Sequence, residues 1–79
     1  MELERQKGDN MNLYEYIGEQ IRHRRKLAGM SQGELAKKLE TNQPTMATIE
    51  RGKRKLSMED LVKLRKIFNI SADDFLPKD

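Results

Sequence analysis

The chain has 79 residues, no cysteine and a formal net charge of +3, with charged residues making up 37% of it and apolar residues 35%. This length accommodates one small domain, and without cysteine neither a disulfide nor a thiolate metal site can brace it. No apolar run approaches the roughly 20 residues that a membrane-spanning helix needs, and none suits a signal peptide, so we expect a cytoplasmic protein. The composition favours a charged helical domain over a β-barrel or a disordered tail.

The charge is unevenly distributed along the chain. Residues 21–55 hold ten basic and three acidic residues, a net charge of +7, whereas the flanks hold six basic and ten acidic residues, a net charge of −4. A basic middle between acidic ends indicates a surface that binds a polyanion. The alternative is charge that only keeps helix surfaces solvated.

The first ten residues show little periodicity and read as a flexible arm. We therefore divide the chain into an N-terminal arm over residues 1–12 and a single domain over residues 13–77. The periodic pattern starts directly after Met11, so either Met1 or Met11 can be the native start.

An amphipathic helix is predicted at the start of the domain. Leu13, Ile17 and Ile21 recur at every fourth residue, and Leu27 extends this apolar face. Gly29 stands where a left-handed residue ends a helix.

A second, shorter helix begins after Ser31. Ser31 and Glu34 have the spacing of a capping box, in which each side chain bonds the other residue's backbone N–H. The residues expected on the inner face of this helix are Leu35, Ala36 and Leu39.

Asn42 can cap a third helix, in which Pro44 is tolerated because it lies in the first turn. Met46 and Ile49 share one face, and Gly52 stops this helix.

Two more helices complete the chain. Ser57 opens the fourth, whose inward residues are Leu61, Leu64 and Phe68. Ser71 caps a very short fifth helix that turns Phe75 and Leu76 inward. Alternating β-branched runs are absent from the sequence, so the predicted fold is all-α, with five helices packed compactly.

The short second and third helices, at roughly 31–39 and 43–51, are separated by a three-residue turn and cannot be stable alone. Packing by the first and fourth helices leaves the start of the third helix exposed. Its side chains are uncharged and small enough to read base edges in a DNA major groove: Gln43, Pro44, Thr45, Ala47 and Thr48. The surrounding cations suit phosphate contacts: Lys37, Lys38, Arg51, Lys53, Arg54 and Lys55.

Several motifs at their joint spacing carry a resemblance to a known family. They are Ile17-Gly18, Ile21-Arg22, Arg25, Ser31-Gln32, Glu34-Leu35-Ala36, Ile49-Glu50-Arg51-Gly52-Lys53 and Ile70-Ser71. The span from Ile17 to Leu76, about three quarters of the chain, resembles the phage-repressor (Cro/CI) helix-turn-helix type, also called the XRE family. The resemblance implies a five-helix, lambda-repressor-like DNA-binding domain that is usually dimeric and regulates transcription.

The resemblance also implies roles for individual residues. Gln32 would bond a phosphate and brace Gln43, which becomes the main base reader. Arg25 and Glu50 occupy the positions of an internal, structural ion pair. Glu40 replaces a common glycine in the interhelical turn, so we expect left-handed backbone strain of about 1 kcal/mol there.

The predicted function is a sequence-specific, double-stranded DNA-binding transcriptional regulator of the nucleoid. We expect a repressor that acts as a homodimer on an inverted repeat, with half-sites about 34 Å apart. Residues that could serve the dimer face are Ile70, Leu76, Leu56 and Met58. Alternatives are an antitoxin-type module that binds a partner protein as well as its own promoter, and a non-specific nucleoid binder.

An enzyme is not expected. The chain has one histidine, His23, which reads as a surface residue, and no glycine-rich phosphate loop. No carboxylates and histidine lie at metal-ligand spacing, so the sequence implies no cofactor and no metal.

Overall fold

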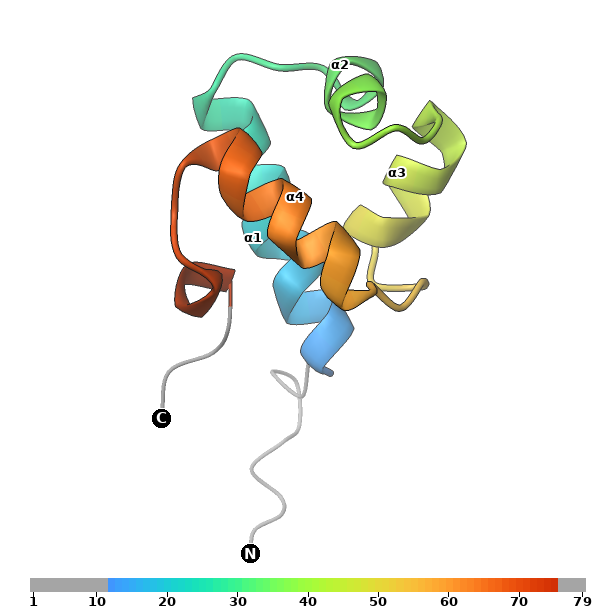
Figure 1. Ribbon diagram of the computed structural model, residues 1–79. Helices are drawn as coiled ribbons and strands as arrows, with labels where there is room; N and C mark the ends of the chain where they lie inside the picture. Colours follow the sequence, from blue (N-terminus) through green and yellow to red (C-terminus); the bar gives the residue numbers. More distant parts are fainter. Residues whose placement is uncertain (1–11, 76–79) are drawn as a thin grey trace, which may run out of the picture.

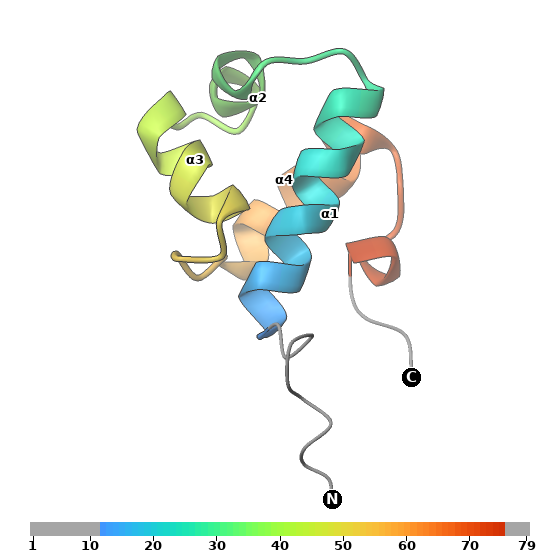
Figure 2. The same ribbon diagram turned by 180° about the vertical axis from the view of Figure 1, so that it is seen from behind.

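A computed structural model describes residues 12–75, and these residues form helices joined by short turns, without a strand. Along the chain lie α1 (Leu13–Leu27), α2 (Gln32–Lys38), α3 (Gln43–Glu50), α4 (Met58–Phe68) and the 3-10 turn η2 (Ala72–Phe75). The predicted arm, apart from Asn12, and residues 76–79 lie outside the described residues. Figures 1 and 2 show α2 and α3 on one side of α1, with η2 on the other.

Side-chain caps start all four α-helices. Ser31 and Glu34 form the predicted capping box, with the Ser31 Oγ accepting from the Glu34 N–H at 3.0 Å. The Asn42 Oδ1 accepts from the Thr45 N–H at 2.9 Å and so caps α3, as expected. These bonds satisfy backbone donors that a helix start leaves without partners.

Four residues with a positive φ follow the helix ends. Gly29 (φ 72°) and Gly52 (φ 75°) confirm the predicted stops of α1 and α3. Glu40 (φ 65°) confirms the predicted left-handed residue after α2, and Asn69 (φ 58°) plays the same part after α4. This conformation lets the next backbone N–H groups close the last helical turn.

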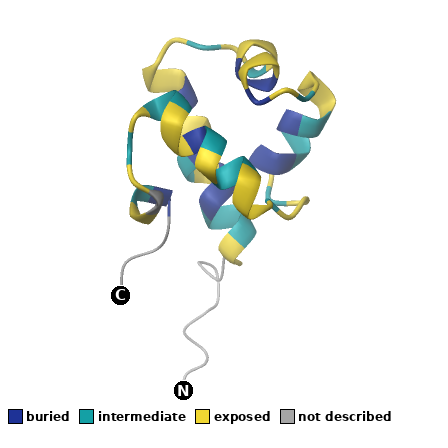
Figure 3. Ribbon diagram, in the orientation of Figure 1, coloured by how far each residue is buried: buried dark blue, intermediate teal, exposed yellow. Residues whose placement is uncertain are grey.

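The core is formed by one apolar face from each helix (Figure 3). Its buried members are Ile17, Ile21, Leu35, Ala36, Leu39, Met46, Ile49, Leu64 and Phe75. Partly buried residues pack around them, including the predicted inward pair Leu61 and Phe68. Because the short helices α2 and α3 hold only four of the nine buried members, with Leu39 directly after α2, their angle depends on packing against α1 and α4.

Two close approaches fix α3 against α1. A Cβ on Gly18 would lie 2.5 Å from the Glu50 carbonyl oxygen, and a Cβ on Gly52 would lie 2.5 Å from the Glu15 Cα. Only glycine permits these backbones to come so near. The end of α3 is therefore locked to the first half of α1.

The five-helix prediction is not confirmed, because the described residues contain four α-helices. Where a fifth was expected, Ala72–Phe75 form a 3-10 turn, too short to build α-helical hydrogen bonding. The Asp74 N–H bonds the Ser71 carbonyl oxygen at 3.1 Å, an i to i+3 bond. Phe75 is nevertheless fully buried, with its ring edge-on to Phe68 at a centroid separation of 6.4 Å.

The apolar face of α1 is shorter than predicted. Ile17 and Ile21 are buried, but Leu27 is 73% exposed. Leu27 follows Ile21 by six residues, a rotation of about 240° that carries its side chain away from the core. None of the helices in the described part of the chain is long and apolar enough to span a membrane.

Candidate nucleic-acid interface

Four side chains from three helices form a continuous hydrogen-bonded chain, which we call the recognition network: Arg25, Glu50, Gln32 and Gln43. Arg25 donates two hydrogen bonds to the Glu50 carboxylate, from Nε to Oε2 at 2.7 Å and from Nη2 to Oε1 at 3.1 Å. The Gln32 Nε2 donates to the Glu50 Oε1 at 3.0 Å. The Gln43 Nε2 then donates to the Gln32 Oε1 at 2.7 Å. The network runs from the core to the exposed start of α3.

Its inner end is a buried ion pair. Arg25 is 8% exposed and Glu50 is 6% exposed, as residues. The third nitrogen of Arg25, Nη1, donates to the Met30 carbonyl oxygen at 2.9 Å. The carboxylate therefore has three donors and the guanidinium three bonds, which is the arrangement that makes burial of two charges tolerable.

The outer end of the network belongs to the surface that the sequence predicted to read bases. Gln43 and Pro44 are exposed, and Thr45, Ala47 and Thr48 are half-buried. The Thr48 Oγ1 donates to the Thr45 carbonyl oxygen at 2.7 Å, so this hydroxyl proton is used inside the helix. None of these five side chains carries a charge.

Cations lie at both ends of α3. Lys37 and Lys38 close α2, directly before the turn into α3, and the loop after α3 carries four more. All six are exposed, and none takes part in an ion pair within residues 12–75: Lys37, Lys38, Arg51, Lys53, Arg54 and Lys55. An uncharged centre with an unpaired cationic rim suits a surface that meets phosphates at its edges.

His23 is exposed on α1, as predicted. Within residues 12–75, no three His, Cys, Asp or Glu side chains are grouped closely enough to hold a metal ion.

The sequence reasoning missed two features of the site. It did not foresee that Gln32 bonds Glu50 as well as Gln43, because side-chain partners so far apart in the chain have no local signal. It also gave Gly18 no role, although a glycine in the middle of a predicted helix is itself a signal of close packing.

Comparison with known proteins agrees with this geometry. The family model HTH_3, described as helix-turn-helix, matches residues 21–75. A search of curated proteins found no match.

Two solved regulators share the fold. The restriction-modification controller protein C.AhdI from Aeromonas hydrophila is 25% identical, with a TM-score of 0.73 over 80% of this chain and 96% of that one. The clp gene regulator ClgR from Corynebacterium glutamicum is 26% identical, with a TM-score of 0.76 over 81% of this chain and 68% of that one.

An enzyme also contains this fold. Hydroxypropylphosphonic acid epoxidase from S. wedmorenis is 23% identical, with a TM-score of 0.75, but the match covers only 34% of it. At this identity the likeness shows the fold alone. The matched family covers most of the described chain, and two regulators share its architecture. The chain therefore belongs to the helix-turn-helix family of the XRE (Cro/CI) type, whose members bind DNA and regulate transcription.

Proposed function

We propose that the protein is a sequence-specific repressor that binds double-stranded DNA as a homodimer, with α3 in the major groove. The observation that carries this proposal is the orientation of Gln43, which is exposed at the first turn of α3 and held there by Gln32. A fixed side chain loses less conformational freedom on binding than a free one.

The Gln43 carboxamide has the right groups left for reading adenine. One of its two N–H donors is used by Gln32, so one N–H and the carbonyl oxygen remain available. Adenine presents an acceptor, N7, and a donor, N6–H, side by side in the major groove, and a glutamine amide can bond both. Pro44, Thr45, Ala47 and Thr48 offer apolar or hydroxyl contacts to neighbouring bases.

The cationic rim supplies the sequence-independent part of binding. We propose phosphate contacts for five cations of the rim, Lys37, Arg51, Lys53, Arg54 and Lys55, and for the neutral side chain of Gln32. Every phosphate neutralised by a cation steepens the fall of log affinity with log salt by about 0.9. The rim therefore sets affinity and its salt dependence, and the centre sets sequence preference.

A dimer follows from the small area that one α3 can read. A symmetric dimer on an inverted repeat doubles this area, with half-sites about 34 Å apart. Repression needs no further surface, because a bound dimer can occupy a promoter directly. The likeness to a restriction-modification controller and to a gene regulator supports this role. We propose no catalytic activity, since the likeness to the epoxidase extends only to the fold.

Selection from a random DNA pool at near-physiological salt tests the proposal. We expect sequencing of the bound fragments to show an inverted repeat. The centres of its two half-sites should be one helical turn of DNA apart. A single enriched half-site would contradict the dimer. Tight binding at low salt without enrichment would contradict sequence-specific recognition.

Two variants then separate reading from phosphate binding. Gln43→Ala should cost about 1–3 kcal/mol on the selected site and relax the preference at one base position. Lys53→Ala should instead weaken binding to all sequences alike and flatten the salt dependence. Unchanged base preference in Gln43→Ala would overturn the assigned role of Gln43.

A further inference from the structure

One group of the recognition network cannot act as a hydrogen-bond donor. The Glu50 carboxylate has two oxygens and no N–H, so it only accepts hydrogen bonds. Its Oε2 accepts from the Arg25 Nε at 2.7 Å, and its Oε1 accepts from the Arg25 Nη2 at 3.1 Å and from the Gln32 Nε2 at 3.0 Å. Gln32 therefore has to turn the nitrogen end of its amide toward Glu50.

This orientation is passed on to Gln43. A glutamine amide carries a donor, its nitrogen, and an acceptor, its oxygen. With its nitrogen bonded to Glu50, Gln32 presents its oxygen to Gln43 and accepts from the Gln43 Nε2 at 2.7 Å. Gln43 consequently keeps its own oxygen and one N–H for DNA. If Gln32 were reversed, it would instead occupy the Gln43 oxygen and leave two N–H donors.

These two arrangements of Gln43 suit different purines. Adenine presents the acceptor N7 beside the donor N6–H, which matches an oxygen together with an N–H. Guanine presents two acceptors, N7 and O6, which match two N–H donors. Reversal of Gln32 beside an intact carboxylate would bring two oxygens together without a proton between them. Glu50 is only 6% exposed, so little water is available to relieve this conflict.

We propose that Glu50 is a positioning residue for base recognition, whose carboxylate fixes which end of the Gln43 amide accepts and thereby selects adenine over guanine. This inference rests on the proposed function, in which Gln43 reads a base. Glu50 is buried at the last position of α3, whereas Gln43 is exposed at the first. The residue that sets the base preference therefore acts through Gln32 and does not touch DNA.

The phosphate proposed for Gln32 favours the same orientation. The Gln32 amide has two N–H groups, of which Glu50 takes one and leaves the second for a phosphate oxygen. The bond to Glu50 is nevertheless already formed in the protein without DNA. Substitution of Glu50 therefore separates its influence from that of the phosphate.

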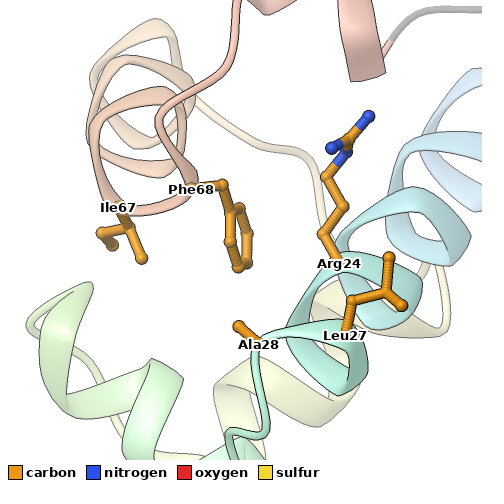
Figure 4. Close-up of a pocket in the computed structure, with 5 residues that line it drawn as sticks. All are labelled: Arg24, Leu27, Ala28, Ile67 and Phe68. Carbon is orange, nitrogen blue, oxygen red and sulfur yellow. The ribbon is translucent and has the colours of Figure 1, made fainter.

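The arginine next to Arg25 provides a matched control. Arg24 is directed to another part of the molecule, where it lines a surface pocket with Ile67 and Phe68 of α4 (Figure 4). All three bonds to the Glu50 carboxylate come from Arg25 and Gln32. Arg24→Met therefore removes a cation from the same turn of α1 and leaves the network intact.

The test compares two DNA duplexes that differ only in carrying adenine or guanine at the position where Gln43→Ala relaxes the preference. The parent protein and Arg24→Met should bind the adenine duplex about tenfold tighter. In Glu50→Gln, whose amide can accept or donate, this ratio should fall to within about threefold of unity. Partial unfolding weakens both affinities by the same factor and leaves their ratio unchanged. A ratio in Glu50→Gln equal to that of the parent would overturn the proposal, because the phosphate alone would then orient Gln32.

A second variant keeps the test valid if Glu50→Gln does not fold. Arg25→Met combined with Glu50→Gln removes both buried charges together, so neither charge is left without compensation. The same loss of adenine preference is expected. In nitrogen–proton spectra of the free protein, one Gln43 Nε2 proton should be shifted downfield by its bond to Gln32 and should lose part of this shift in the double variant. An identical shift in both proteins would contradict the assigned role of Glu50.

Gln43→Ala separates the failure of this inference from the failure of the proposed function. If this variant keeps the base preference of the parent protein, Gln43 reads no base, and the proposed reading function fails together with the inference. If it loses the preference while Glu50→Gln keeps it, only the role of Glu50 is refuted.

Discussion

Two ion pairs within the described residues join positions that are far apart in the sequence. Their nitrogen–oxygen distances are similar, but their exposure to water is not. Arg25 and Glu50 approach to 2.7 Å, and Lys63 and Glu40 approach to 3.0 Å. The side chains of the first pair are 10% and 2% exposed, whereas those of the second are 33% and 76% exposed. Similar distances therefore describe one pair removed from water and one largely within it.

The surroundings decide what each pair does. Water competes with the exposed pair, so its loss costs little, but loss of one member of a buried pair leaves a charge without compensation. The buried pair also continues through Gln32 to Gln43, which connects the core to the proposed reading surface. The exposed pair joins α4 to the turn between α2 and α3, where Glu40 adopts a left-handed backbone conformation.

The largest effect is expected at the buried pair. Arg25→Met should lower the free energy of unfolding by about 3–5 kcal/mol, because Glu50 remains buried without its cation. Urea unfolding followed by circular dichroism measures this loss. The control Arg22→Met removes an exposed arginine 3.9 Å from Glu19 and should change stability by less than about 1 kcal/mol. Unchanged stability together with lost DNA binding would reassign Arg25 to a phosphate contact.

The next largest loss of stability is expected at Gln32, in the middle of the recognition network. Gln32→Ala should lower stability by about 1–2 kcal/mol, because Glu50 loses one of its three donors. It should also weaken the base preference attributed to Gln43, whose amide is no longer held. Gln43→Ala serves as the comparison, since it should affect the base preference but leave the unfolding curve in place. Equal destabilisation by the two variants would show that the outer bond, and not Glu50, carries the energy.

The left-handed turn offers a stabilising change. Glu40→Gly should raise the free energy of unfolding by about 1 kcal/mol, because glycine adopts φ 65° without strain. Asn69→Gly should raise it less, since asparagine tolerates this conformation better than glutamate. Thermal unfolding of the two variants shows which substitution stabilises the protein more. A net loss in the Glu40 variant would mean that its bond to Lys63 outweighs the backbone strain.

The smallest effect is a shift with pH at the exposed pair. The hydrogen bond from Lys63 to Glu40 raises the Lys63 pKa above its ordinary value of 10.5. A pKa raised by folding adds stability that is fully present below the unfolded value and is lost as the pH rises through the folded value. The contribution should therefore disappear above pH 10.5, as followed by NMR titration of the Lys63 side chain. Glu40→Gln is the control and should return the pKa toward its ordinary value.

Much of the fold could be predicted because its signals are local. Capping residues such as Ser31 and Asn42 act within one helical turn, and Gly29 and Gly52 mark helix ends by their own backbone freedom. The start of α1 at Asn12 uses the same kind of signal and was overlooked, although Asn12 and Glu15 form a full capping box.

Features that depend on packing could not be read from spacing. Leu27 looked like an extension of the apolar face, but no helix covers it in the described structure. The role of Gly18 depends on where α3 ends in space, and the partner of Glu40 lies 23 residues away. Among the candidate site residues, exposure was predicted correctly for Gln43 and Pro44, but three of the five expected to be exposed are half-buried: Thr45, Ala47 and Thr48. The link from Glu50 to Gln43 required the three-dimensional arrangement.

The internal hydrogen bond of Thr48 affects how the proposed base-reading surface would respond to a methylated base. Since its hydroxyl proton is given to the Thr45 carbonyl oxygen, the Thr48 Oγ1 can still accept a hydrogen bond but not donate one, and the methyl group is the part of Thr48 that can make apolar contact with a base. A thymine methyl is the natural partner of such a group in the major groove. Cytosine methylated at C5 carries a methyl group at the same ring position. With α3 docked as proposed, a modifying methyltransferase could therefore alter how strongly this protein holds its site, without changing the base sequence.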